Sequence, residues 1–177
     1  AKAVNPGFEV NDLGFMGRVD YLNLGSGASY TDSKPGKLLR SYSLFAGTNH
    51  AWNYGGDKIW TSLFNQVTLN FNNLWSVYGG GEYDPSAIDD RLTRGGPRGR
   101  QPTQWGVWTQ IVTDQRKTVS YNLYSDHYGD TAGGYLNDLT VGFDIRPSSS
   151  IHVTISPSIA KFHNTIQYVE ATSDPLA

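Results

Sequence analysis

Residues 135–145 read Tyr-Leu-Asn-Asp-Leu-Thr-Val-Gly-Phe-Asp-Ile, and one set of alternate positions in this run is mostly apolar while the other is mostly polar. This period of two places successive side chains on opposite faces of a β-strand. A short Arg-Pro-Ser-Ser turn follows at 146–149, and the alternation resumes from residue 150. The two runs therefore predict a hairpin of long antiparallel strands.

The same alternation recurs upstream, and helical spacing does not. It predicts strands over residues 16–31, 38–52, 58–71, 74–82, 104–114, 117–128, 135–145 and 150–163. Because short connections join successive strands, we expect an all-β, antiparallel, up-and-down meander of about eight long strands. Its 177 residues form one domain, 1–177.

The composition is typical of a β-protein and excludes several classes of function. Charged residues make up 17% of the chain, aromatic residues 13%, and there are 20 glycines, a mixture typical of strands and turns rather than helices. The absence of Cys excludes disulfides and thiolate metal sites, and we expect no cofactor. The net charge of −2, without a basic aromatic face, argues against nucleic acid as a partner.

Strand length and loop length favour a membrane barrel over a β-sandwich. Several predicted strands run 11 residues or more, whereas strands commonly have ~5–6 residues and membrane-spanning ones need ~9–11. Tight turns at 72–73, 114–116 and 147–149 alternate with longer connections at 53–57, 83–103 and 129–134. This alternation is typical of bacterial outer-membrane barrels, which have short periplasmic turns and long external loops.

The aromatic residues allow three interpretations. A barrel would place tryptophans near the strand ends as interfacial girdles, and the candidates are Trp52, Trp60, Trp75, Trp105 and Trp108. A soluble or surface carbohydrate-binding β-protein would instead stack sugar rings on the same kind of residue, with Tyr83, Tyr124 and Tyr128 as further candidates. In the third interpretation, the tryptophans are ordinary core residues of a soluble β-protein.

Two segments resemble a known family. The opening Asn-Pro-Gly-Phe-Glu-Val-Asn-Asp-Leu-Gly-Phe at 5–15 and the Thr-Arg-Gly-Gly-Pro stretch at 93–97 resemble large, uncharacterised bacterial outer-membrane proteins that join an N-terminal carbohydrate-binding-like β-sandwich to a C-terminal β-barrel. The resemblance lies within the barrel part and implies an interior slice of a larger barrel. It implies as partners outer-membrane lipid and the remaining strands of the barrel or partner subunits, and it supplies no reaction.

The loop near 83–103 and the strand that precedes it hold the densest charge. The charged candidates are Glu82, Asp84, Asp89, Asp90, Arg91, Arg94, Arg98 and Arg100. Clustered carboxylates suit calcium, but the spacing is not that of an EF-hand and the adjacent arginines offer simpler partners, so a solvated or self-paired loop is the preferred interpretation. In a barrel this loop could fold back over the mouth and filter solutes by charge.

No arrangement predicts catalysis. The four histidines are scattered without metal-ligand spacing, and sequence fixes no geometry for a glycosidase carboxylate pair. We therefore expect an outer-membrane barrel component with a transport, export or structural role and no enzymatic activity. A carbohydrate-binding β-protein, with polysaccharide as its partner, is the alternative.

Overall fold

The computed structural model describes residues 1–8, 17–93 and 96–165. These residues form strands joined by turns and loops, and none of them belongs to a helix that could cross a membrane. The strands are β1 (Lys2–Val4), β2 (Tyr21–Asp32), β3 (Leu39–Trp52), β4 (Lys58–Phe71), β5 (Ser76–Asp84), β6 (Ile88–Asp89), β7 (Gly99–Arg100), β8 (Gln104–Val112), β9 (Val119–Asp130), β10 (Tyr135–Ser148), β11 (Ile151–Ile155) and β12 (Ser158–His163).

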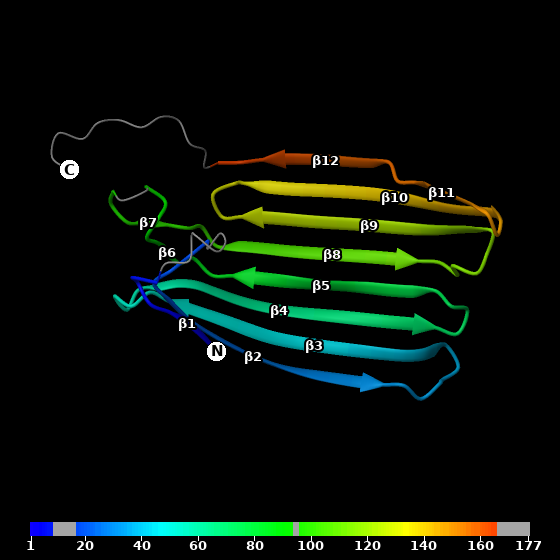
Figure 1. The fold of residues 1–177 in the computed structure, drawn as a ribbon, viewed down its shortest axis with the longest axis horizontal. Helices are drawn as coiled ribbons and strands as arrows, with labels where there is room; N and C mark the ends of the chain where they lie inside the picture. The colour runs from blue at the N-terminus through cyan, green and yellow to red at the C-terminus, as the bar shows by residue number, and fades with distance from the viewer. Residues whose placement is uncertain (9–16, 94–95, 166–177) are drawn as a thin grey trace.

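One antiparallel sheet contains ten of these strands. Its order is β1-β2-β3-β4-β5-β8-β9-β10-β11, with β12 also paired to β10, and β6 and β7 form a separate two-stranded ladder. The long strands lie side by side in a single layer (Figure 1). The antiparallel meander is therefore confirmed. Among the described residues the two edges of the sheet do not pair with each other, so the sheet is open.

Most predicted strands agree with the observed ones, and the range 58–71 is the same in both. The predicted strand 150–163 is divided into β11 and β12, because Pro157 has no N–H to continue the ladder. Its carbonyl still accepts a hydrogen bond from Val141 N at 3.0 Å. The pairs Phe143–Ile155 and Thr140–Ser158 keep one register on both sides of the interruption.

Several other strand boundaries differ from the prediction by a few residues. The first long strand begins at Tyr21 rather than at residue 16, which lies outside the described residues, and Asp20 directly before it has a positive φ of 60°. The expected turn at 147–149 moves to 149–150, because β10 continues to Ser148 through a register shift. The two- and three-residue strands β1, β6 and β7 were not predicted, since they are too short to show a period.

The connections lie at two ends of the sheet, which we name the loop end and the turn end. The loop end carries residues 53–57, 85–103 and 131–134, and the turn end carries 33–38, 72–75, 113–118 and 149–150. The expected difference in length rests on one connection, 85–103. The connection 53–57 has its predicted bounds, and 131–134 is shorter than predicted because Gly129 and Asp130 belong to β9. Neither is longer than the turn-end connections 33–38 and 113–118.

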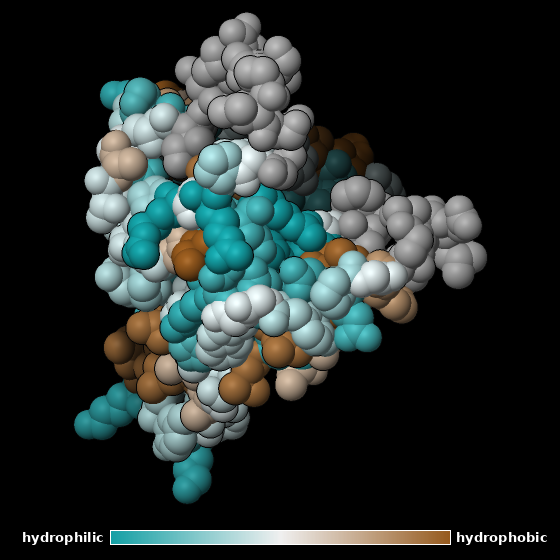
Figure 2. Space-filling model, turned by 90° about the vertical axis from the view of Figure 1, so that its left-hand side faces the viewer, coloured by the Kyte–Doolittle hydropathy of each residue, from teal (hydrophilic) through white to brown (hydrophobic). Residues whose placement is uncertain are grey.

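The sheet has almost no interior of its own. No large side chain of the described residues is fully buried, and the buried apolar residues are small in number: Val4, Ala51, Ile59 and Ala87. All four lie at the loop end, where the loop 85–103 contacts β4. Figure 2 looks onto this end and shows hydrophilic residues gathered over its middle. Both broad faces of the sheet are thus free of a second packed layer within the described residues.

Candidate functional site: the two faces of the sheet

Strand register assigns each side chain to one of two faces, since directly paired residues in an antiparallel sheet point the same way. Pairing runs from Leu63 to Tyr83 and on to Trp105 on one face. The neighbouring positions run from Phe64 to Glu82 on the other face. We name these the apolar face and the polar face.

The apolar face exposes large hydrophobic side chains along its whole width. Leu24 on β2 is 53% exposed, Trp105 on β8 47%, and Ile159 on β12 70%. Every exposed large hydrophobic residue on the described strands lies on this face, except Trp60 and Phe162. The remaining members are Leu22, Tyr30, Leu44, Leu63, Tyr83, Val107, Val119, Tyr121, Leu123, Leu139, Ile151, Val153 and Ile155.

Polar residues of the apolar face bond to one another. His50 accepts or donates hydrogen bonds with Thr48 at 3.0 Å and with Thr61 at 3.3 Å. His127 does so with Ser125 at 3.1 Å and with Asn137 at 2.7 Å. These side chains therefore satisfy part of their hydrogen-bonding capacity within the sheet, which lowers the cost of placing them among apolar neighbours.

The polar face presents aromatic rings between amides and carboxylates. One row across the strands reads Phe45, Gln66, Gly80, Trp108, Asp126 and Asp138. The next row toward the loop end reads Gly47, Phe64, Glu82, Gly106, Tyr128 and Leu136. A third row, toward the turn end, contains Tyr78, Gln110, Tyr124 and Thr140.

Aromatic rings of the polar face lie across glycines of the preceding strand. A Cβ added to Gly80 would lie 2.6 Å from the Trp108 ring, and one added to Gly47 would lie 2.8 Å from the Phe64 ring. Tyr128 covers Gly106 in the same way, and Phe45 covers Gly27. Only a residue without a side chain leaves room for these rings, which is a recurrent use of glycine in strands.

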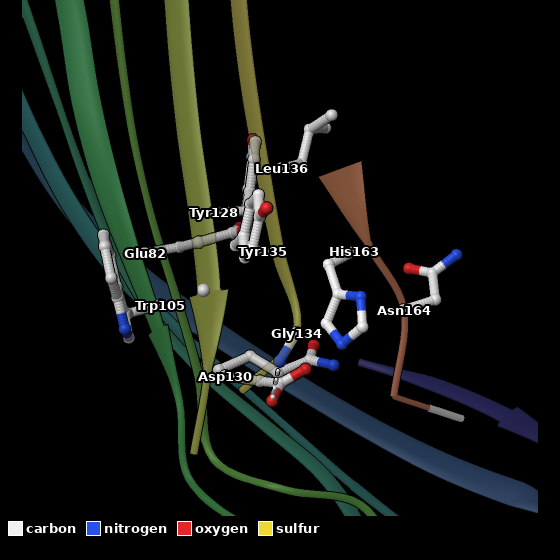
Figure 3. A pocket seen from close by; sticks show the side chains of 11 residues that line it. Glu82, Trp105, Tyr128, Asp130, Gly134, Tyr135, Leu136, His163 and Asn164 are labelled. Carbon is white, nitrogen blue, oxygen red and sulfur yellow. Dashed lines mark hydrogen bonds between the residues drawn. The ribbon is translucent and has the colours of Figure 1, made fainter. Parts of the chain in front are cut away.

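A pocket of about 180 Å³ lies at the loop end of β8, β9 and β10. Its wall includes Glu82 and Tyr128 of the polar face together with Asp130, Tyr135 and His163. Figure 3 shows the Glu82 side chain extending toward Tyr128. Asp130 Oδ1 accepts hydrogen bonds from Ala132 N and Gly134 N, so this carboxylate is committed to the turn.

The charged candidates from the sequence do not form one site. Glu82 and Asp84 belong to the polar face at the end of β5, where Asp84 accepts a hydrogen bond from Trp60 Nε1 at 3.0 Å. Asp89 accepts one from Gln101 Nε2 at 2.9 Å. Among the residues that the structure describes, no three His, Cys, Asp or Glu side chains come together as a metal site.

The remaining loop charges fasten the loop to other segments rather than to itself. Asp90 forms an ion pair with Arg18 at 2.6 Å, and Arg98 forms one with Asp57 at 2.7 Å. Arg91 donates to the carbonyls of Gly17 and Val19 at 3.1 Å. Arg100 is on β7, and Arg94 lies outside the described residues. Pairing between loop acids and loop arginines, one of the two arrangements that the sequence favoured, is thus not the main arrangement.

Asp90 is the carboxylate of the loop 85–103 that interacts with both Arg18 and Asn53. Burial raises its pKa, but hydrogen bonds from Arg18 and Asn53 outweigh this effect, and the pKa lies below its usual range. The Asn53 amide also donates to Asp57, at 3.0 Å. One network therefore joins the loop, the turn 53–57 and the segment before β2.

The aromatic candidates divide between the faces. Trp52, Tyr83 and Trp105 lie on the apolar face at the loop end, while Trp75 is in a connection at the turn end. Trp60, Trp108, Tyr124 and Tyr128 lie on the polar face. Alternation placed Gln66 and Asp138 at polar positions of their strands, as observed, but sequence reasoning did not name either of them as a candidate site residue.

These features define a class: a single-layer antiparallel β-sheet with one apolar and one polar face and a fastened loop at one end. The chain matches, over residues 1–176, the model of a family described as a domain of unknown function, DUF5916, and it belongs to that family. No curated protein and no solved structure matches it.

Proposed function

We propose that this chain forms part of the wall of a bacterial outer-membrane β-barrel, with its apolar face toward lipid and its polar face toward the lumen. The observation that supports this most directly is the gathering of exposed large hydrophobic residues on one face of a sheet that has no second layer. A water-soluble sheet normally covers such a face with helices or another sheet. Lipid is the covering that requires no further protein layer.

The placement of aromatic residues on the apolar face supports the same orientation. Trp52, Tyr83, Trp105 and Tyr135 lie toward the loop end, and Tyr30, Tyr42, Tyr121 and Phe143 lie toward the turn end. Tyr135 and Phe143 are eight residues apart on β10. At ~3.4 Å per residue and a strand tilt of ~40°, they are separated by roughly 20 Å along the membrane normal, close to the ~25 Å apolar band of these barrels.

The free edges of the sheet determine what else the barrel needs. Strand β1 pairs only with the first residues of β2, and the outer edges of β11 and β12 have no partner among the described residues. Because unpaired backbone groups are not tolerated in lipid, further strands of the same barrel or a partner subunit would complete the sheet. The role is transport, export or structural support, with no catalysis by this chain.

The test is fractionation of the protein expressed with its native signal and flanking sequence. We expect it in the outer-membrane fraction, dependent on detergent for a monodisperse state, with gel migration that changes on heating. A protein that is monodisperse in plain buffer would contradict the proposal and would favour the carbohydrate-binding alternative in a soluble form.

A further inference from the structure

We propose that the polar face is a binding surface for neutral saccharides, built on the rings of Trp108 and Tyr128 and on the hydrogen-bonding groups of Gln66, Glu82 and Asp126. This inference rests on the proposed function, because it names the class of solute that would contact the lumen wall. It is carried by the arrangement of rings, amides and carboxylates along two adjacent rows of the sheet.

The rings have the placement that stacking requires. Trp108 lies across Gly80, and Tyr128 lies across Gly106, so the sheet supports one side of each ring. Both side chains remain partly exposed, which leaves ring surface available to a ligand. A sugar ring presents C–H groups on its faces, and an aromatic ring that is rigidly supported binds such a surface at little cost in side-chain entropy.

Hydrogen-bonding groups flank the rings at the distance of a neighbouring strand. Asp126 is paired directly with Trp108, and Gln66 lies on the other side of Gly80 in the same row. Asp126 Oδ2 accepts a hydrogen bond from the Tyr124 hydroxyl at 3.3 Å, while its buried Oδ1 has no partner. A ligand hydroxyl would therefore donate to Oδ2, which keeps a further lone pair beside the Tyr124 hydroxyl, because Oδ1 is closed off from solvent.

The charge of the surface selects among saccharides. Strands β5, β8 and β9 contain no Lys or Arg, whereas Glu82, Asp126 and Asp138 all lie on this face. Carboxylates without cationic partners repel anionic sugars and accept hydrogen bonds from hydroxyls. A neutral oligosaccharide therefore fits the surface better than a sulfated or uronic acid polymer. The same carboxylates would also attract a polyamine, so the experiment has to distinguish polyamine binding from saccharide binding.

Trp105 and Trp108 provide a matched pair for the test, because they lie on the same strand and on opposite faces. Binding of maltohexaose, cellohexaose and mannohexaose to the protein expressed with its flanking sequence, in detergent micelles, would be measured by saturation-transfer NMR and calorimetry. We expect Trp108→Ala to weaken binding by about tenfold and Trp105→Ala to leave it unchanged. Trp108→Phe, which keeps a ring over Gly80, should retain most of the affinity. This variant still tests the proposal if the alanine variant does not fold.

Asp126→Ala should weaken binding severalfold, and Asp126→Asn, which keeps an acceptor oxygen, should weaken it less. The proposal is overturned if no hexasaccharide binds below about 10 mM, if both tryptophan variants lose affinity equally, or if spermidine binds while the saccharides do not. Quenching of Trp105 by brominated lipid in reconstituted vesicles tests the membrane proposal separately. Quenched Trp105 without saccharide binding would contradict only the present inference.

Discussion

The two faces of one strand differ in how far their large side chains are exposed. On β8, Trp105 and Val107 are exposed on the apolar face, whereas Trp108 and Gln110 lie partly covered on the polar face. The backbone is shared, so the difference comes from side-chain type and from neighbours alone. On the polar face, rings fold down over glycines. On the apolar face, Trp105 lies across Gly129 in the same way, but aliphatic side chains such as Leu24 and Ile159 are more than half exposed.

The largest expected effect comes from placing a charge on the apolar face. Val141→Arg, or Leu123→Arg beside it, should destabilise the folded protein in lipid by about 2–3 kcal/mol, because both positions lie inside the apolar band between the levels of Tyr135 and Phe143, where a guanidinium loses its hydration. Reversible unfolding by denaturant from lipid vesicles would measure it.

The matched control is Thr140, the neighbour of Val141 that lies on the polar face. Thr140→Arg should cost clearly less than Val141→Arg, and Thr140→Ser should be mild. Equal losses for both arginine variants would mean that the two faces have the same environment, and the membrane orientation would be wrong.

The polar face should be sensitive to its glycines instead. Gly106→Ala should destabilise by about 1–3 kcal/mol, because the new methyl group would overlap the Tyr128 ring. The same substitution made in a Tyr128→Ala background should cost less, since the ring is then absent. Thermal unfolding of the four proteins of this cycle would give the coupling; an unchanged cost of Gly106→Ala would show that the ring does not determine it.

A smaller effect, confined to the loop end, is expected at Asp90. Asp90→Asn should weaken the attachment of the loop 85–103 by about 1 kcal/mol, because one charge-assisted hydrogen-bond pair with Arg18 is lost. Since the folded pKa of Asp90 is lowered, its stabilising contribution is complete above the unfolded pKa of about 4 and is lost as the pH falls through the folded value.

Hydrogen exchange of the loop amides at pH 7 and at pH 3 would measure this attachment. Protection should fall at pH 3 in the wild-type protein and be less pH-dependent in Asp90→Asn. Equal pH dependence in the two proteins would assign the change to other groups.

The smallest effect is expected at the turn end. The Arg116 guanidinium pairs with Asp114 at 3.0 Å, and hydrogen bonds from Arg116 lower the pKa of Asp114. The arginine is largely exposed, so water and salt screen the pair. Arg116→Gln should leave the unfolding midpoint within measurement error, and a shift as large as that of Gly106→Ala would show that the turn contributes more than its exposure implies.

Sequence reasoning succeeded where the physical signal was local. The alternation over 58–71 predicted β4 with its observed bounds, and the Asp-Gln-Arg turn at 114–116 joins β8 to β9 as expected. These features depend on periodicity and on turn residues, which are visible within a few positions of the chain.

The site was harder to predict because it depends on register. Trp108 and Trp105 look equivalent in the sequence, yet three positions along a strand reverse the face. The partners of the loop charges were also hidden, since Arg18 and Asp90 are 72 residues apart and no local pattern joins them. The face of each aromatic residue could have been assigned by counting alternate positions from Tyr83, but the ion pairs could not.

The pairing of each long strand with its neighbour in sequence has a consequence for how the sheet assembles. All successive long strands are joined by connections of a few residues except β5 and β8, which are separated by the 19 residues between Asp84 and Gln104. Closing a loop of that length costs roughly 1–1.5 kcal/mol more chain entropy than closing a four-residue turn. Strands before and after this point are joined by short connections and can pair as two separate groups, and the pairing of β5 with β8 is the contact between neighbouring strands that requires the longest loop to close.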